Sequence, residues 1–139
     1  MKIKRVEHIA VALKSMGKMH DILENKLGIK MEYNEEFPEY HTKIAMYPVG
    51  GTYIELLESD HPKTETSEWI EEHGEGLFHI CLEVEDIDSA LIELKAKGIA
   101  LIDAEPRIGH GGARIAFLNP ASTGNVLIEL AELPEKPAH

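Results

Sequence analysis

The sequence lacks the features that mark a secreted or a membrane protein. Cys81 is its one cysteine, so no internal disulfide can form within the 139 residues, which fits a reducing compartment. No stretch approaches the roughly 18 apolar residues of a membrane helix. The start of the chain is basic but has no apolar core and no small-residue cleavage site, so it does not resemble a signal peptide. We therefore expect a cytoplasmic protein without a membrane partner.

Basic residues are scarce as well. Lys and Arg number 14 against 25 Asp and Glu, which gives a formal net charge of −11. With no basic excess to displace counterions, the net charge opposes nonspecific binding to nucleic acid, whereas a small anionic ligand needs only a local basic pocket. A hydrophobic fraction of 43% and a charged fraction of 28% are those of an ordinary globular protein. The length predicts a single domain over 1–139.

The chain contains an internal repeat. Segments 6–29 and 77–99 each have a His-Ile pair at their third and fourth residues, continue as a strand, pass a polar turn and enter a helical stretch that ends in Gly-Ile. His8 and His79 therefore occupy equivalent places. A repeated pattern of this kind predicts that one supersecondary unit has been duplicated.

A second pair of residues repeats with the first. Segments 52–58 and 126–132 share the sequence Ile-Glu-Leu, which puts Glu55 in register with Glu129. The separation from histidine to glutamate is 47 residues in the first half and 50 in the second. Two positions that recur at matched spacing strengthen the interpretation as a duplication.

The repeated residues share one strand face. Side chains of a strand alternate between its two faces, so large apolar residues of one parity pack on a helix while the other parity points away. In the first strand Ile9, Val11 and Leu13 form the apolar parity. The same alternation recurs around the other three positions. The residues expected on the face away from the helices are His8, Glu55, His79 and Glu129.

These four side chains predict a metal site. A carboxylate between Ile and Leu in a strand is expensive to bury unpaired, and binding a divalent ion relieves that cost. Two imidazoles and two carboxylates suit Co, Ni, Mn, Fe or Zn, and the ligand types alone do not choose among them. We expect one divalent ion per chain; four separate solvent-facing side chains are the alternative. The predicted ligands are His8, Glu55, His79 and Glu129.

The fold class follows from the same pattern. We expect an α+β chain made of two βαβββ repeats, over about 3–58 and 76–132, joined by a connecting helix at 64–73. The two sheets would pair into a curved, cup-shaped mixed sheet with the helices outside. The expected helix of the first repeat and the later strands of the second are, in order, 15–27, 100–103, 112–118 and 125–132.

A tandem βαβββ chain with His at the start of each half and Glu in each last strand resembles the vicinal oxygen chelate (glyoxalase/bleomycin resistance/dioxygenase) superfamily. Within it, "EPRIGHGGARIAFL" (105–118) and the "NPASTGNVLIEL" that follows resemble methylmalonyl-CoA epimerases. The resemblance implies metal-dependent interconversion of (R)- and (S)-methylmalonyl-CoA, an acyl-CoA substrate and a homodimer. It implies metal ligands at the same four positions: His8, Glu55, His79 and Glu129.

The sequence departs from this family pattern at two places. The family typically reads His-Pro-Lys where this chain has Asn119, Pro120 and Ala121. Some members carry a second carboxylate base in the strand at about 42–46, where this chain offers Lys43. A basic substrate contact and one acid–base group must therefore be absent or supplied from elsewhere.

The implied reaction assigns further roles. Epimerisation removes a proton that lies between a thioester carbonyl and a carboxylate, with a base on one face and an acid on the other. Glu129 is the candidate catalytic residue for one of these roles. The opposite partner stays open among Glu39, His41 and Lys43, and the lysine would need a depressed pKa.

The "GHGG" loop (109–112) is not a P-loop, because it lacks the GxxxxGKS pattern. It fits either a tight hairpin or a mobile lid. Arg107 and Arg114 flank it and are either partners of an anionic substrate or ordinary surface residues.

Two other functions use the same fold. One is a lactoylglutathione lyase of the glyoxalase I type, and the other is a non-catalytic small-molecule-binding protein. The presence of all four candidate ligands favours an enzyme.

Overall fold

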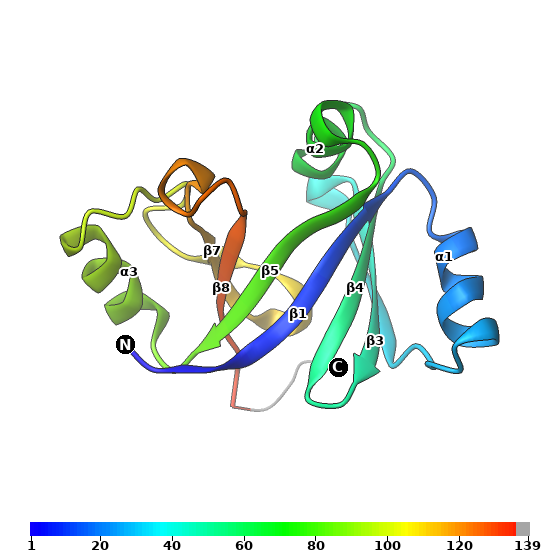
Figure 1. Cartoon of the computed structure of the whole chain (residues 1–139), viewed down its shortest axis with the longest axis horizontal. Helices are drawn as coiled ribbons and strands as arrows, with labels where there is room; N and C mark the ends of the chain where they lie inside the picture. The colour runs from blue at the N-terminus through cyan, green and yellow to red at the C-terminus, as the bar shows by residue number, and fades with distance from the viewer. Residues whose placement is uncertain (136–139) are drawn as a thin grey trace. The chain divides into compact units, whose positions relative to one another are not determined.

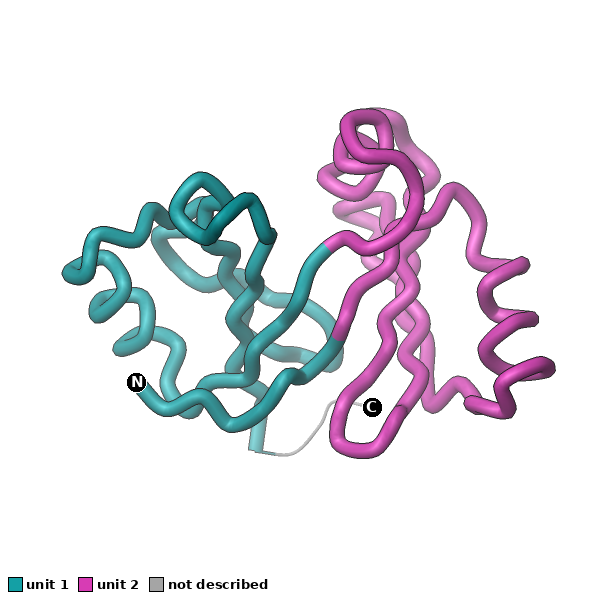
Figure 2. The backbone as a smooth tube through the Cα atoms, in the orientation of Figure 1, with its two compact units in different colours: residues 1–8, 79–139 teal, residues 9–78 magenta. Residues whose placement is uncertain are grey.

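The computed structural model of the chain describes residues 1–135, and they form an α+β fold (Figure 1). The chain divides into two compact units (Figure 2). Unit 1 consists of residues 1–8 and 79–139, and unit 2 of residues 9–78. No helix in the described part of the chain is long and apolar enough to cross a membrane.

Unit 2 carries the first βαβββ repeat and the connecting helix. Its strands follow the hydrogen-bonded order β2-β3-β4-β1, with β2–β3 and β3–β4 antiparallel. The side chain of Thr64 accepts a hydrogen bond from the backbone of Ser67 and caps the connecting helix, as the sequence predicts. The elements are β1 (Ile3–Leu13, which begins in unit 1), α1 (Gly17–Asp21), the π-helix η1 (Ile22–Lys26), β2 (Tyr33–Phe37), the 3₁₀ turn η2 (Pro38–Tyr40), β3 (Thr42–Val49), β4 (Thr52–Ser59) and α2 (Glu65–His73).

Unit 1 carries the second repeat. Its strands follow the order β1-β5-β8-β7-β6, with β5 and β8 parallel and β7 antiparallel to both β8 and β6. Asp86 caps the helix of this repeat by accepting a hydrogen bond from the backbone of Ser89. The elements are β5 (Gly76–Val84, which begins in unit 2), α3 (Ile87–Ala96), β6 (Arg107–Ile108), the 3₁₀ turn η3 (His110–Gly112), β7 (Arg114–Phe117), the 3₁₀ turn η4 (Pro120–Ser122) and β8 (Ile128–Glu132). The predicted α+β class and the two βαβββ repeats are confirmed.

The core of unit 1 occupies one face of β5 and β8, so the candidate ligands on these strands lie on the other face. Helix α3 packs on β7 and β8 (Figure 1). The parity that carries Leu82 and Val84 on β5 and Ile128 and Leu130 on β8 belongs to this core. The intervening residues point the other way, because strand side chains alternate. The buried core residues are Val84, Ile87, Ala90, Leu91, Ala116, Leu118 and Leu130.

The same alternation of side chains applies to the strands of unit 2. Its core centres on Leu23 of the π-helix, and Ile54 and Leu56 of β4 pack with it, which places Glu55 on the opposite face of the strand. Val11 and Leu13 join this core as predicted. Ile9 does not and is 38% exposed, because the core reaches only the last residues of β1.

The predicted helix at 15–27 is two short segments. Helix α1 ends at Asp21 and a π-helix follows, in which the backbone N–H of Leu27 bonds to the carbonyl of Ile22. Gly28 ends it with φ of 75°, a left-handed conformation that favours glycine. The spacing of apolar residues does not distinguish a π-helix, with hydrogen bonds between residues five apart, from an α-helix, with bonds between residues four apart. Over so short a segment both place similar residues on the buried side.

The predicted strand at 100–103 is wrong. The segment forms an isolated bridge, Leu101 to Leu118, and a few backbone hydrogen bonds to the end of β7, but no regular strand. The backbone N–H of Phe117 bonds instead to the carboxylate of Asp103. A side chain thus occupies a place that a backbone carbonyl would take in a ladder. On the side of β7 away from β8, the strand that pairs with β7 is β6, which follows Pro106.

Candidate metal centre

Three of the four predicted ligands come together in unit 1. His8 is the last residue of unit 1 in β1, His79 lies in β5 and Glu129 in β8. Parallel pairing places Cys81 beside Glu129, and His79 lies two residues before that cysteine, so it occupies the same strand face. The register of β5 with β8 therefore brings His79 and Glu129, the repeated residues of the second half, to one face of the sheet in unit 1.

The ligand atoms of these residues form a small triangle. Nε2 of His8 lies 3.1 Å from Nε2 of His79, and Oε1 of Glu129 lies 3.0 Å from the first nitrogen and 3.1 Å from the second. Nitrogen and oxygen ligands bind divalent metals at about 2.1 Å, and two such ligands at a right angle are about 3.0 Å apart. The triangle therefore has the spacing of adjacent ligands around one ion.

The burial of the triangle supports the same interpretation. The exposed fractions are 0% for His8, 6% for His79 and 3% for Glu129. Although both imidazoles approach Oε1 of Glu129, neither makes a well-aligned hydrogen bond to it. A buried carboxylate oxygen without such a bond is costly, and a cation removes that cost. The residues present thus fit a divalent metal.

The electrostatics keep Glu129 ionised. Burial by itself raises the pKa of this carboxyl, but the imidazoles of His79 and His8 outweigh burial and bring the pKa well below its ordinary value. Because ligand carboxylates must be deprotonated, Glu129 is in the form that binds a cation.

An outer pair of residues supports His8. Oε1 of Glu7 lies 2.5 Å from Nδ1 of His8 and 2.8 Å from Nε2 of His110, and all three side chains are buried. Burial raises the pKa of Glu7, but the hydrogen bonds from His110 and His8 outweigh it and lower the pKa to about 2. The sequence analysis missed both Glu7 and His110. Neither residue belongs to the repeated His and Glu pattern, so the sequence carries no local signal for them.

Glu55, the fourth predicted ligand, lies in unit 2. It is 3% exposed and pairs in register with Met46 of β3. Its face of β4 is the one that the core of unit 2 does not use. Glu55 stays a predicted ligand.

Cys81 also lies near the triangle. Its thiol, with Glu7 and His8, forms a second group whose ligand atoms lie within 4.8 Å of one another. Burial and the charge of Glu129 raise the pKa of this thiol well above its ordinary value. A thiol binds metals as the thiolate, so the triangle fits a divalent metal better than the group that contains Cys81 does.

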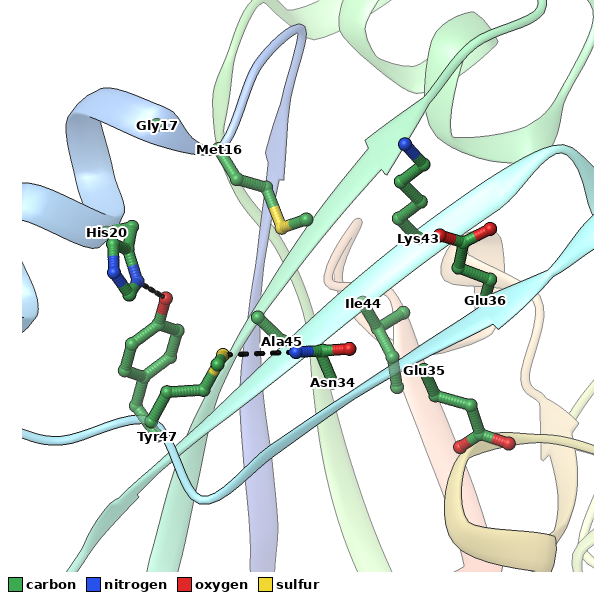
Figure 3. Close-up of a pocket in the computed structure, with 11 residues that line it drawn as sticks. Met16, Gly17, His20, Asn34, Glu35, Glu36, Lys43, Ile44, Ala45 and Tyr47 are labelled. Carbon is green, nitrogen blue, oxygen red and sulfur yellow. Dashed lines mark hydrogen bonds between the residues drawn. The ribbon is translucent and has the colours of Figure 1, made fainter.

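The structure separates the open acid–base candidates. Lys43 has the strand parity of Ala45 and Tyr47, opposite to Met46, which pairs with Glu55. Together with α1 these residues line a cavity of about 310 Å³ within unit 2, where His20 meets the hydroxyl of Tyr47 (Figure 3). Lys43 therefore points away from the face of the sheet that carries Glu55.

The other two candidates for this role are exposed. Nδ1 of His41 lies 3.3 Å from the carboxylate of Asp60, and Glu39 lies in the exposed turn η2. Neither is held by buried contacts in unit 2, so the second acid–base group stays unassigned.

The "GHGG" segment is a turn that joins β6 to β7, as the hairpin interpretation predicts. A β-carbon at Gly109 would come within 2.9 Å of side-chain atoms of Ile115, so the Ile115 side chain fills the space that a larger residue would need. Arg114 forms a bidentate pair with Asp88 at 2.7 and 3.0 Å, which favours the interpretation as a surface residue. Arg107 lies 3.4 Å from Asp103 and over the ring of Phe117.

Comparison with known sequences gives a consistent result. The model of the Glyoxalase/Bleomycin resistance protein/Dioxygenase superfamily matches residues 7–117. The chain is 32% identical over 130 residues to the uncharacterized protein YqjC of Bacillus subtilis, covering 94% of this chain and 93% of that protein. It is 32% identical over 136 residues to the ethylmalonyl-CoA/methylmalonyl-CoA epimerase of Cereibacter sphaeroides, covering 94% and 99%.

A solved structure gives the same result. The chain superimposes with a TM-score of 0.91 on a variant of the Streptomyces coelicolor methylmalonyl-CoA epimerase in complex with 2-nitronate-propionyl-CoA. The two are 26% identical, and the match covers 99% of this chain and 100% of the other.

Proposed function

This chain belongs to the glyoxalase/bleomycin resistance protein/dioxygenase superfamily, and from that premise we propose that it is a metal-dependent epimerase of methylmalonyl-CoA. The observation that carries the proposal is the buried triangle of His8, His79 and Glu129, whose atoms have the spacing of metal ligands. The similarity to acyl-CoA epimerases along almost the whole chain selects the substrate class. The homodimer stays a prediction.

Four residues of this chain would hold one divalent ion. His8, His79 and Glu129 provide two imidazoles and a carboxylate from unit 1, and Glu55 is the predicted fourth ligand from unit 2. A divalent ion bound there supplies positive charge that makes an α-proton beside a carbonyl more acidic and stabilises the enolate that its loss creates. Since Co, Ni, Mn, Fe and Zn all suit this ligand set, the proposal does not depend on one metal.

Glu129 is the group that moves the proton on one face of the substrate. Its carboxylate is ionised, so it can take the proton from the α-carbon and leave the electron pair as an enolate. The side chain is 3% exposed and belongs to the second residue of β8, whose backbone is held by pairing with both β5 and β7. A second acid–base group on the opposite face, which stays unassigned, would then deliver a proton there and complete the inversion.

Exchange of the α-proton tests the proposal. Protein supplied with Co²⁺ is incubated with (S)-methylmalonyl-CoA in deuterated water, and mass spectrometry follows deuterium at the α-carbon. We expect exchange well above the uncatalysed rate, together with formation of the (R) isomer. A chelator should stop both, and added Co²⁺ should restore them.

Two results would contradict the proposal. Turnover of the methylglyoxal–glutathione hemithioacetal without exchange of methylmalonyl-CoA would identify a lyase of the glyoxalase I type. Inactivity with both compounds in fully metallated protein would favour a binding protein of the same fold.

A further inference from the structure

The carboxylate of Glu7 connects two histidines that come from distant parts of unit 1. One oxygen, Oε1, lies 2.5 Å from Nδ1 of His8 and 2.8 Å from Nε2 of His110. The other oxygen lies 3.7 Å from the guanidinium of Arg5. Glu7 is 2% exposed and His110 is 5% exposed, so these contacts form away from bulk water.

The chemistry of a carboxylate fixes the direction of both hydrogen bonds. An ionised carboxylate only accepts, so Nδ1 of His8 and Nε2 of His110 must each carry a hydrogen. A neutral imidazole has one N–H and one lone pair. With its hydrogen on Nδ1, His8 presents the lone pair of Nε2 to His79 and Glu129, which is the tautomer a metal ligand at Nε2 requires.

His110 holds the same carboxylate from the turn between β6 and β7. Its ring stands edge-on to the ring of His8, with centroids 4.8 Å apart and an angle of 88° between the planes. Gly111 and Gly112, with φ of 59° and 79°, make the tight turn that places this ring. The "GHGG" segment thus carries a buried histidine that the proposed reaction leaves without a role.

We propose that Glu7 and His110 are positioning residues for the metal centre: Glu7 sets the tautomer and ring orientation of His8, and His110 holds Glu7 in place. This inference rests on the proposed metal site. Outer partners of metal-binding histidines tune affinity through such contacts, and losing one typically costs about 10- to 100-fold.

Glu83 provides a matched control for Glu7. It is also a mostly buried carboxylate of unit 1, and it pairs with the same arginine: Nε of Arg5 lies 2.6 Å from its Oε1. Within residues 1–135 Glu83 forms no hydrogen bond with His8; its partners are Arg5 and Lys4. Replacing Glu83 by Gln therefore removes a comparable charge next to Arg5 but leaves His8 undisturbed.

Calorimetric titration of metal-free protein with Co²⁺ tests the assignment. We expect Glu7→Gln to weaken binding about 10- to 100-fold and Glu83→Gln to leave it within about twofold. His110→Phe keeps a ring but removes the donor, and should weaken binding in the same direction. His110→Gln, which restores an N–H donor, should recover part of the loss.

A second measurement does not depend on variant stability. Nitrogen-15 NMR of metal-free wild-type protein labelled at histidine should show His8 with its hydrogen on Nδ1. Finding the hydrogen on Nε2, or equal Co²⁺ affinity for Glu7→Gln and wild type, would overturn the inference. Failure of wild-type protein to bind Co²⁺ would instead count against the proposed metal site, and the NMR result would still decide the role of Glu7.

Discussion

Replacing Glu129 by Gln is expected to lower kcat for α-proton exchange by about 10²- to 10⁴-fold, the range typical for loss of a general base. Glutamine keeps an oxygen where Oε1 of Glu129 lies, 3.0 Å from Nε2 of His8. Its amide cannot take up the α-proton. Metal affinity should therefore fall much less than the exchange rate, because the proposed ligand role survives in part and the base role does not.

Glu132→Gln is the matched control for this change. Glu132 lies on the same strand, three residues later, and its carboxylate accepts a hydrogen bond from the backbone of Ile87 at the start of α3. This variant should keep wild-type exchange. If Glu129→Gln kept exchange within about threefold of wild type, Glu129 would not be the base. If metal binding were lost as completely as activity, the residue would act as a ligand only.

His79→Ala is expected to remove metal binding and activity together. The imidazole is 6% exposed and its Nε2 lies within 3.1 Å of both His8 and Glu129, so alanine leaves a gap in the ligand set. The loss of affinity should exceed the roughly 10- to 100-fold typical of an outer partner. Elemental analysis of dialysed protein and the exchange assay measure the two effects on one sample.

His73→Ala serves as the comparison for His79→Ala. His73 ends α2 in unit 2, where its ring stacks on Trp69, and its side chain is exposed. This variant should retain about one metal ion per chain. Normal metal content in His79→Ala, or equal loss in both variants, would contradict the assignment of His79 as a ligand.

Local periodicity explains how much of the site could be predicted. His79 and Glu129 each alternate with large apolar residues along one strand, and the repeat relates them to His8 and Glu55. Such patterns show which face a side chain occupies. In unit 1 the register of β5 with β8 then brings the ligands of the second repeat together.

The contacts that escaped prediction join residues without a local pattern. His110 and Glu7 are 103 residues apart, and their contact depends on the turn that Gly111 and Gly112 form. Segment 100–103 likewise meets the end of β7 through one isolated bridge and a hydrogen bond to the side chain of Asp103, in place of a full ladder. Such tertiary hydrogen bonds override the propensity of a short segment.

The central claim is that the repeated histidines and glutamates hold one divalent ion. Crystals of protein supplied with Co²⁺, measured at the cobalt absorption edge, test it most directly. One anomalous peak per chain is expected, about 2.0–2.3 Å from Nε2 of His8, Nε2 of His79, Oε1 of Glu129 and a carboxylate oxygen of Glu55. A peak bound instead by Cys81, or no peak between His8, His79 and Glu129 in protein saturated with Co²⁺, would contradict the claim.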